Sequence, residues 1–234
     1  MTIAAVAMQD DLMRMNSISQ NLANVTTPAY KREIATTGAF SGYLARASGV
    51  GLAAGERSVV VDPKAGTLRQ TGNPLDLAID GEGYFEVSSE EGPAYTRQGA
   101  MHIDSRGVLV TANGLPVMGL GGEVSLSGAP LAINAEGEIR QGERVVAQLK
   151  LVRFANPEAL APFGNGLYRQ GAARLGDAAT VGKLRTGYQE NSNVNSPHEM
   201  VLLTETVRHF ESMQKVMQGY NDAYETAIRK LGEF

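Results

Sequence analysis

Hydrophobic residues recur at a helical spacing near the N-terminus. At seven-residue steps they are Met1, Met8, Met15 and Leu22, and four residues after each of the first three stand Ala5, Leu12 and Ser19. Positions spaced in this way lie on one face of an α-helix. Residues 1–27 contain no glycine, and Thr27-Pro28 predicts the end of the helix, because proline disfavours the α conformation at the residue before it.

A second helical pattern covers the C-terminal end of the chain. Ser196-Pro197-His198-Glu199 is typical of a capping box with Ser196 at the N-cap. Two heptad columns follow, an a column of Met200, Val207, Gln214, Asn221 and Ile228 and a d column of Leu203, Phe210, Met217, Tyr224 and Leu231. A flanking column of Met213, Tyr220 and Ala227 widens the apolar face. This face is wider than one partner helix covers, so the pattern favours self-assembly over a simple intramolecular helix pair.

Between the two ends, short apolar runs alternate with glycine turns. The runs are Leu75–Ile79, Tyr84–Val87, Val108–Val110 and Val145–Val152, and the turn signals include Asp80-Gly81, Asn113-Gly114 and Glu136-Gly137. This texture is typical of consecutive antiparallel strands. We therefore predict an α+β fold in which paired, coiled-coil-like N- and C-terminal helices flank a central all-β domain. The expected domains are residues 1–30 with 190–234 (helical), 31–65 (a connector rich in Ala, Gly and Ser) and 66–189 (β).

Composition narrows the possible functions. The 234 residues include no cysteine, which excludes thiol catalysis and Cys-ligated metal centres. A formal net charge of −4 argues against nucleic-acid binding, and the absence of an 18-residue apolar run argues against membrane insertion. The first residues lack a basic region, so we expect export, if any, by a route that needs no cleaved signal peptide.

Candidate catalytic and metal-binding residues are few. His198-Glu199 opens like a zinc-protease motif, but Leu202 occupies the position of the second histidine. The glycines of Gly81-Glu82-Gly83 and Gly164-Asn165-Gly166 are explained by turn geometry. The basic pair Lys31-Arg32 is interpreted as a solvated helix end. We therefore expect no enzyme activity, no cofactor and no metal.

Three segments of the chain resemble signatures of the bacterial flagellar rod and hook protein family. The first is Asn21-Leu22-Ala23-Asn24-Val25-Thr26-Thr27-Pro28-Ala29-Tyr30-Lys31-Arg32, and the central one is Gly66-Thr67-Leu68-Arg69-Gln70-Thr71-Gly72-Asn73-Pro74-Leu75-Asp76-Leu77-Ala78-Ile79-Asp80-Gly81-Glu82-Gly83-Tyr84-Phe85, continued by Tyr95-Thr96-Arg97-Gln98-Gly99. The third comprises Ser192-Asn193-Val194-Asn195, Glu199-Met200-Val201 and Arg208-His209-Phe210-Glu211. They occur in the family's order and cover nearly the whole chain.

The resemblance implies a structural axial subunit of the flagellar basal body, located in the periplasmic rod. It implies that the terminal helices pack with those of neighbouring rod subunits, copies of this chain included, around the export channel. The expected partner in transit is the flagellar type III export apparatus. The assembly residues it implies, together with the helical columns, are Asn21, Leu22, Ala23, Asn24, Thr27, Pro28, Tyr30, Lys31, Ser192, Asn193, Val194, Glu199, Met200, Leu203, Val207, Phe210, Gln214, Met217, Asn221 and Tyr224.

Two details refine the resemblance. The family commonly carries glycine after the Thr-Pro pair, where this chain has Ala29. If that position requires a positive φ, Ala29 costs about 1 kcal/mol. Only 39 residues separate Arg32 from Gly72, a short connector that resembles the proximal-rod type, with a distal-rod or hook-type subunit as the alternative.

Other classes of function make different predictions. A coiled-coil dimer carrying a carbohydrate-binding β module is disfavoured by the 6% aromatic content and the absence of tryptophan. A hydrolase could use Asp76 and Asp80 as paired carboxylates, although the apolar run between them is typical of a core strand. In the helical seam, we expect the polar side chains of Gln214 and Asn221 to fix the register of helix association.

Overall fold

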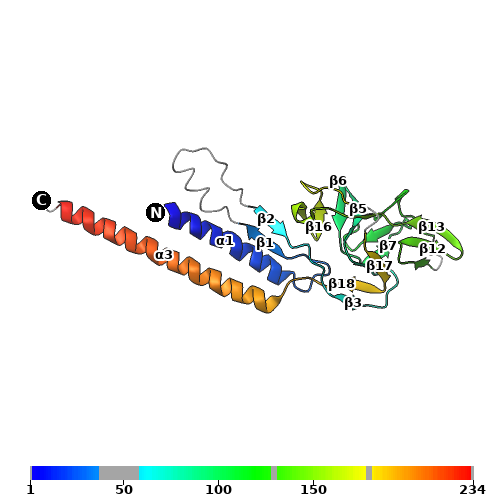
Figure 1. Cartoon of the computed structure of the whole chain (residues 1–234), viewed down its shortest axis with the longest axis horizontal. Coiled ribbons are helices and arrows are strands. Elements are labelled where there is room, and N and C mark those ends of the chain that lie inside the picture. The colour runs from blue at the N-terminus through cyan, green and yellow to red at the C-terminus, as the bar shows by residue number, and fades with distance from the viewer. Residues whose placement is uncertain (1, 37–57, 128–130, 178–180, 233–234) are drawn as a thin grey trace. The chain divides into compact units, whose positions relative to one another are not determined.

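A computed structural model describes residues 2–36, 58–127, 131–177 and 181–232 (Figure 1). The chain forms two compact units. The helical unit comprises Met1–Ala23, Glu33–Val59 and Asn195–Phe234, and the β unit comprises Asn24–Arg32 and Val60–Val194. Terminal helices thus flank a central β region, which confirms the predicted α+β class.

Two helices build the helical unit. The helix α1 (Thr2–Ala23) and the helix α3 (Ser196–Gly232) pack side by side and run antiparallel (Figure 1). The helix α1 ends at Ala23, four residues before the predicted stop, because the Asn24 carbonyl accepts the Thr27 N–H in a turn of 3.0 Å N···O distance. The N-cap of α3 is Asn195 rather than Ser196, since the Asn195 Oδ1 atom accepts the His198 N–H at 3.1 Å.

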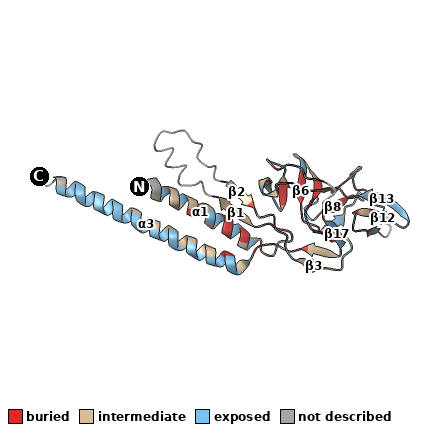
Figure 2. Ribbon diagram, in the orientation of Figure 1, coloured by how far each residue is buried: buried red, intermediate tan, exposed pale blue. Residues whose placement is uncertain are grey.

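The buried face of α1 differs from the one that the heptad columns predict. Ala5, Leu12 and Ser19 are exposed, whereas Ile18 and three polar residues, Asp11, Ser17 and Asn21, are buried. On α3, the d-column residues Leu203, Phe210 and Met217 are half-buried, together with Val207 of the a column and the flanking Met213. Met200, Gln214, Asn221 and Tyr224 are exposed within the single chain. One α1 helix therefore covers only one side of the wide apolar face of α3 (Figure 2).

Many short strands build the β unit. Their bounds are β3 (Leu68–Gln70), β4 (Leu77–Asp80), β5 (Tyr84–Ser89), β6 (Gly92–Thr96), β7 (Met101–Ile103), β8 (Leu109–Thr111), β9 (Met118–Gly119), β10 (Gly122–Glu123), β11 (Leu131–Ile133), β12 (Glu138–Gln141), β13 (Arg144–Gln148), β14 (Leu151–Val152), β15 (Ala161–Gly164), β16 (Leu167–Arg169), β17 (Lys183–Thr186) and β18 (Tyr188–Glu190). A short 3-10 helix, η1, spans Pro157–Ala159. The predicted turns at Gly81, Gly114 and Gly137 are confirmed, and each of these glycines has a positive φ.

The strands pair antiparallel in several small sheets. The largest has five strands in the order β14-β5-β6-β16-β15, and a three-stranded sheet has the order β11-β12-β13. The pairs β17-β4, β18-β3, β7-β8 and β10-β9 complete the unit. The main core gathers fully buried Leu77, Phe85, Leu109 and Ile139. A second, aromatic core includes Tyr84, Tyr95, Phe154 and Tyr168, whose rings meet edge to face.

The predicted connector contains structure that its sequence did not indicate. The strand β1 (Glu33–Thr36) pairs with β2 (Ser58–Val61), so both ends of the segment are extended. Residues 37–57, the middle of the expected connector, lie outside the described residues. Residues 24–30, which we expected with the helices, group with the β unit because their backbone pairs with residues 190–193: Ala29 donates to the Glu190 carbonyl at 2.8 Å, and Asn193 donates to the Tyr30 carbonyl at 3.2 Å.

Candidate assembly surface and buried anchor

The helical unit carries a large exposed apolar surface. The side chains that form it on α3 are mostly more than half exposed, and they include Met200, Val216, Tyr220, Tyr224 and Ile228. Figure 2 shows that the C-terminal half of α3 is exposed along its length. Soluble monomers rarely leave so continuous an apolar helix face in water, so the surface indicates a site of association.

An apolar groove extends this surface across both helices. It encloses about 340 Å³ and is lined by Ala5, Met8, Gln9, Leu12, Phe210 and Met217. Phe210 and Met217 belong to the d column of α3, and Leu12 is 48% exposed on α1. The groove therefore joins residues from the predicted heptad patterns of both helices into one apolar strip.

Polar side chains form hydrogen bonds between α1 and α3. The Asn21 Nδ2 atom donates to the Glu199 Oε2 atom at 3.2 Å, and both residues are fully buried. The same Asn21 amide clamps the backbone of Glu33, donating to its carbonyl and accepting its N–H at 2.8 Å each. Farther along the helices, the His209 Nδ1 atom lies 2.6 Å from the Oδ2 atom of buried Asp11.

A buried charge cluster, which we call the anchor, lies in the β unit. It consists of Lys31, Arg97 and Glu190, whose side chains are at most 3% exposed. The Glu190 Oε1 atom accepts the Lys31 ammonium at 2.5 Å and the Gly66 N–H at 2.8 Å, and its Oε2 atom accepts the Arg97 Nε–H at 2.8 Å. Lys31 was interpreted as a solvated helix end; that interpretation is wrong, because its side chain is buried and pairs with Glu190, which lies 159 residues away in sequence.

Backbone carbonyls accept most of the remaining donors of the anchor. The Arg97 guanidinium donates to the carbonyls of Ile79, Gly81 and Gly83, and the Lys31 ammonium donates to the carbonyl of Lys64. Burial lowers the pKa of Lys31, and the neighbouring Arg97 lowers it further against the opposing effect of Glu190. The first and central signature segments thus converge on one carboxylate.

Asn193 strengthens the same region through its side-chain amide. Its Oδ1 atom accepts the Arg32 N–H at 2.6 Å, and its Nδ2 group donates to the carbonyls of Asp62 and Lys64. The segments 24–32 and 190–194 lead by covalent connection to α1, β1 and α3. The anchor and Asn193 hold these segments on the β unit.

The other predicted residues fall into two groups. Tyr30 and Val194 are buried, and Leu22, Asn24, Thr27, Pro28 and Ser192 are half-buried. Ala23 is exposed. The structure therefore separates the predicted set into junction residues, which stabilise the chain internally, and helix-face residues such as Met200 and Tyr224, which remain accessible. The sequence analysis did not identify Glu190 as the partner of Lys31 and Arg97. Arg97 itself lies within the Tyr95–Gly99 segment that resembles the family's central signature.

The candidate catalytic residues form ordinary structural contacts. Asp80 is half exposed and pairs with Arg185 at 2.7 Å, whereas Asp76 is buried and accepts a hydrogen bond from Asn73. His102 and His198 are exposed. In the ranges that the structure describes, no three His, Asp or Glu side chains gather in a way that could hold a metal ion.

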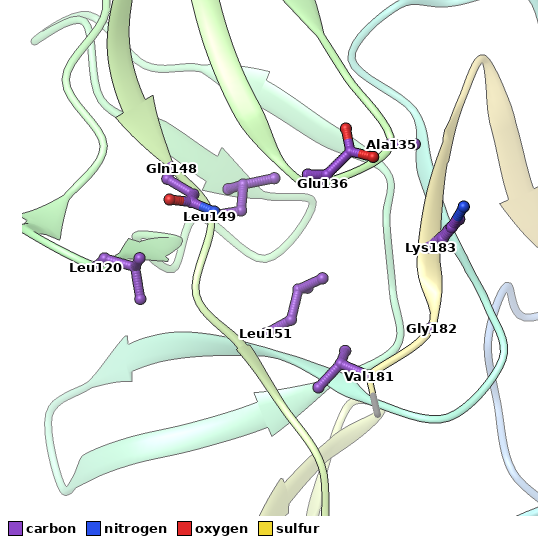
Figure 3. Close-up of a pocket in the computed structure, with 9 residues that line it drawn as sticks. All are labelled: Leu120, Ala135, Glu136, Gln148, Leu149, Leu151, Val181, Gly182 and Lys183. Carbon is purple, nitrogen blue, oxygen red and sulfur yellow. The ribbon is translucent and has the colours of Figure 1, made fainter. Parts of the chain in front are cut away.

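A hollow of about 320 Å³ lies in the β unit (Figure 3). Leu120, Leu149, Leu151 and Val181 give it an apolar lining, and Glu136 supplies the one carboxylate among its lining residues. A paired-carboxylate mechanism needs two such groups about 5–10 Å apart. The lining therefore does not favour the hydrolase hypothesis.

Comparison with known proteins identifies the family. The model of the flagellar hook protein FlgE/F/G D1 domain matches residues 78–141, and that of the flagellar basal body rod FlgEFG protein C-terminal region matches residues 185–230. The basal-body rod protein FlgG of Bacillus subtilis is 30% identical, with 87% of this chain and 88% of that protein covered. The chain belongs to the flagellar basal-body rod protein family.

Relatives named FlgF have a similar sequence identity to this chain. FlgF of Caulobacter vibrioides is 32% identical, with 72% of this chain and 70% of that protein covered. FlgF of Rhizobium meliloti is 31% identical, with 94% of this chain and 92% of that protein covered. Within the described residues, neither helix is both long and apolar enough to cross a membrane. Proteins of this family are located in the basal body of the flagellum, which agrees with the expected location.

Proposed function

We propose that this chain is a non-enzymatic axial subunit of the proximal rod, which self-assembles and joins other rod subunits through α1 and α3 around the export channel. The observation that carries the proposal is the set of exposed apolar side chains on α3, which are Met200 and Val201 near its N-terminal end and Val216, Tyr220, Tyr224 and Ile228 in its C-terminal half. In the single chain, α1 covers only part of the apolar face of α3, so neighbouring helices are needed to bury the rest. Torque would then pass between subunits through these helical contacts.

The proximal position rests on the short connector. The 39 residues between Arg32 and Gly72 resemble the proximal-rod type, and a distal-rod subunit is the alternative. Transit through the flagellar type III export apparatus is part of the same proposal. Immunogold labelling of purified basal bodies measures the distance of the subunit from the export gate. Labelling confined to the distal end of the rod would contradict the proximal assignment.

Assembly through α3 can be tested with the purified chain. The variant Tyr224→Ser/Ile228→Ser removes two exposed apolar side chains, and Asp222→Ser is the control on the same helix. We expect the unmodified chain and the control to sediment as open-ended, concentration-dependent assemblies, whereas the double variant stays small. Discrete dimers of the unmodified chain would favour the binding-module hypothesis instead.

Motility of single variants in cells distinguishes a role in assembly from a role in catalysis. Asp80→Asn and His198→Ala remove the best catalytic candidates and should leave motility near normal, apart from a local turn or capping effect of about 1 kcal/mol. Secretion of each variant is measured alongside, so that failed export is not mistaken for failed assembly. Loss of motility with an intact rod would indicate chemistry at these side chains.

A further inference from the structure

Two polar pairs connect α1 and α3, and in each pair the residue on α1 is buried. Asp11 faces His209 and Asn21 faces Glu199. Asn21 lies ten residues after Asp11, and Glu199 lies ten residues before His209, so both pairs belong to a single antiparallel alignment of the helices (Figure 1). At a rise of about 1.5 Å per residue, the pairs are about 15 Å apart along the helix axes.

We propose that these two pairs set the register in which α1 packs against α3. A shift of α3 by one heptad would place Leu202 or Val216, instead of His209, opposite Asp11. The carboxylate of Asp11 is buried and would then lose its cationic or hydrogen-bonding partner. In one of these shifts, Asn21 would face Thr206, and Glu199 would lose the amide that donates to it.

The apolar contacts do not discriminate between these alignments. The half-buried residues of α3, Leu203, Phe210 and Met217, recur at seven-residue steps, as do Met8, Met15 and Leu22 on α1. A heptad shift therefore replaces one apolar contact with another of similar kind. Polar groups that find their hydrogen-bond partners in only one alignment make that alignment more stable than the shifted ones.

The strand β1 orients the Asn21 side chain toward Glu199. Its amide makes two hydrogen bonds to the backbone of Glu33, which fix the direction of the Nδ2 group that donates to Glu199. The residues at which we expected register control, Gln214 and Asn221, are exposed in the single chain. Register within the chain is thus assigned to Asp11 and Asn21 on α1.

The register has a consequence that rests on the proposed function. It sets which part of α3 extends past the N-terminal end of α1 and hence which apolar side chains, such as Tyr220, Tyr224 and Ile228, are presented to neighbours. A shift by one heptad would move that surface by about 10 Å along the axis. Subunits with mixed registers would present mismatched faces.

Disulfide trapping tests the proposal, because the chain contains no cysteine. Ala5→Cys with Met217→Cys reports the observed register, since the alignment of Asp11 with His209 and of Asn21 with Glu199 places Ala5 opposite residue 215, two residues from Met217. Ala5→Cys with Tyr224→Cys or with Phe210→Cys reports a shift of one heptad in either direction. Each reporter pair is placed in the full-length chain, oxidised under equilibrating thiol buffer and quantified by mass spectrometry.

The reporters are compared in three backgrounds. These are the unmodified chain, Asp11→Leu/Asn21→Leu, and the control Asn16→Leu/Ser19→Leu, which makes the same polar-to-leucine change at two exposed positions of α1. We expect the observed-register disulfide to exceed the shifted ones at least tenfold in the unmodified chain and the control. In Asp11→Leu/Asn21→Leu the ratio should fall to within about threefold.

Two results would overturn the proposal. One is an unchanged ratio in Asp11→Leu/Asn21→Leu. The other is loss of all three disulfides, which would show that these residues hold the helices together without choosing their alignment. The single variants Asp11→Leu and Asn21→Leu, each of which keeps one pair, should give intermediate ratios. The measurement is made at a chain concentration below that at which assemblies sediment, so failure of rod assembly cannot produce or hide the effect.

Discussion

Removing the charge of Glu190 is the most direct perturbation of the anchor. In Glu190→Gln the side chain keeps its size, but its oxygen and amide replace a carboxylate that accepts three hydrogen bonds. Lys31 and Arg97 would then be two buried cations without a buried counter-charge. The new amide also brings its own donors to a site where all the neighbours donate.

The size of the destabilisation follows from the loss of the negative charge that Lys31 and Arg97 share. Breaking a buried ion pair by removing one partner costs about 3–5 kcal/mol, because the remaining charge stays desolvated. Two cations lose their partner here, so we expect Glu190→Gln to lower the free energy of unfolding of the β unit by about 4 kcal/mol. The double variant Lys31→Met/Glu190→Gln buries one cation fewer and should recover part of that loss.

Urea unfolding followed by circular dichroism measures these differences. Glu143→Gln, which removes the charge of an exposed glutamate, is the control and should change stability by less than about 0.5 kcal/mol. Hydrogen exchange should show the first loss of protection at residues 24–32 and 190–194. A loss below about 1 kcal/mol for Glu190→Gln would refute the reasoning and show that water reaches the two cations.

Two further predictions concern the β unit. Gly66→Ala should destabilise it by about 3 kcal/mol in urea unfolding, because a Cβ atom there would lie 1.9 Å from the Asn191 carbonyl oxygen; Gly121→Ala, where a Cβ meets nothing within 4 Å, should be neutral. Burial raises the pKa of Tyr84 to about 12, so the unfolded chain loses this proton first above pH 10, and stability should fall by about 1.4 kcal/mol for each pH unit from 10 to 12. Tyr84→Phe should flatten that part of the profile, and an equally steep loss in the variant would contradict the assignment.

The sequence was a good guide wherever local pattern decides the structure. Alternating apolar runs and glycine turns predicted β4, β5 and β8, and the spacing of apolar residues predicted both helices. These features depend on neighbours within a few residues, which a single sequence displays directly.

The sequence was a poor guide where partners are distant. The heptad rule looks for apolar residues, so it placed Leu12 in the seam and left out Asp11 and Asn21, which are buried because His209 and Glu199 satisfy them. Lys31 was misread for the same reason. Phe210 is only half-buried, so the full cost of about 3–5 kcal/mol for Phe210→Ala requires the contacts of an assembled rod.

Ala29 shows how a departure from the family's common glycine is tolerated. Its φ of 58° lies in the left-handed region, and its side chain is 1% exposed. That conformation costs a residue other than glycine about 1–2 kcal/mol. Glycine would lose about 0.4–1 kcal/mol through the entropy of the unfolded chain and about 0.8 kcal/mol through the missing buried methyl group. Ala29→Gly should therefore change the free energy of unfolding by less than about 1 kcal/mol.

Ala29→Val is the sharper test of this backbone conformation. A β-branched residue is a genuine outlier in the left-handed region, and the two added methyl groups would have to enter a site that is already closed. We expect a loss of about 3 kcal/mol in urea unfolding, with the hydrogen bond from the Ala29 N–H to the Glu190 carbonyl weakened in hydrogen exchange. If Ala29→Val is as stable as Ala29→Gly, residue 29 does not keep its positive φ in solution, and the 24–32 segment is held by the anchor and Asn193.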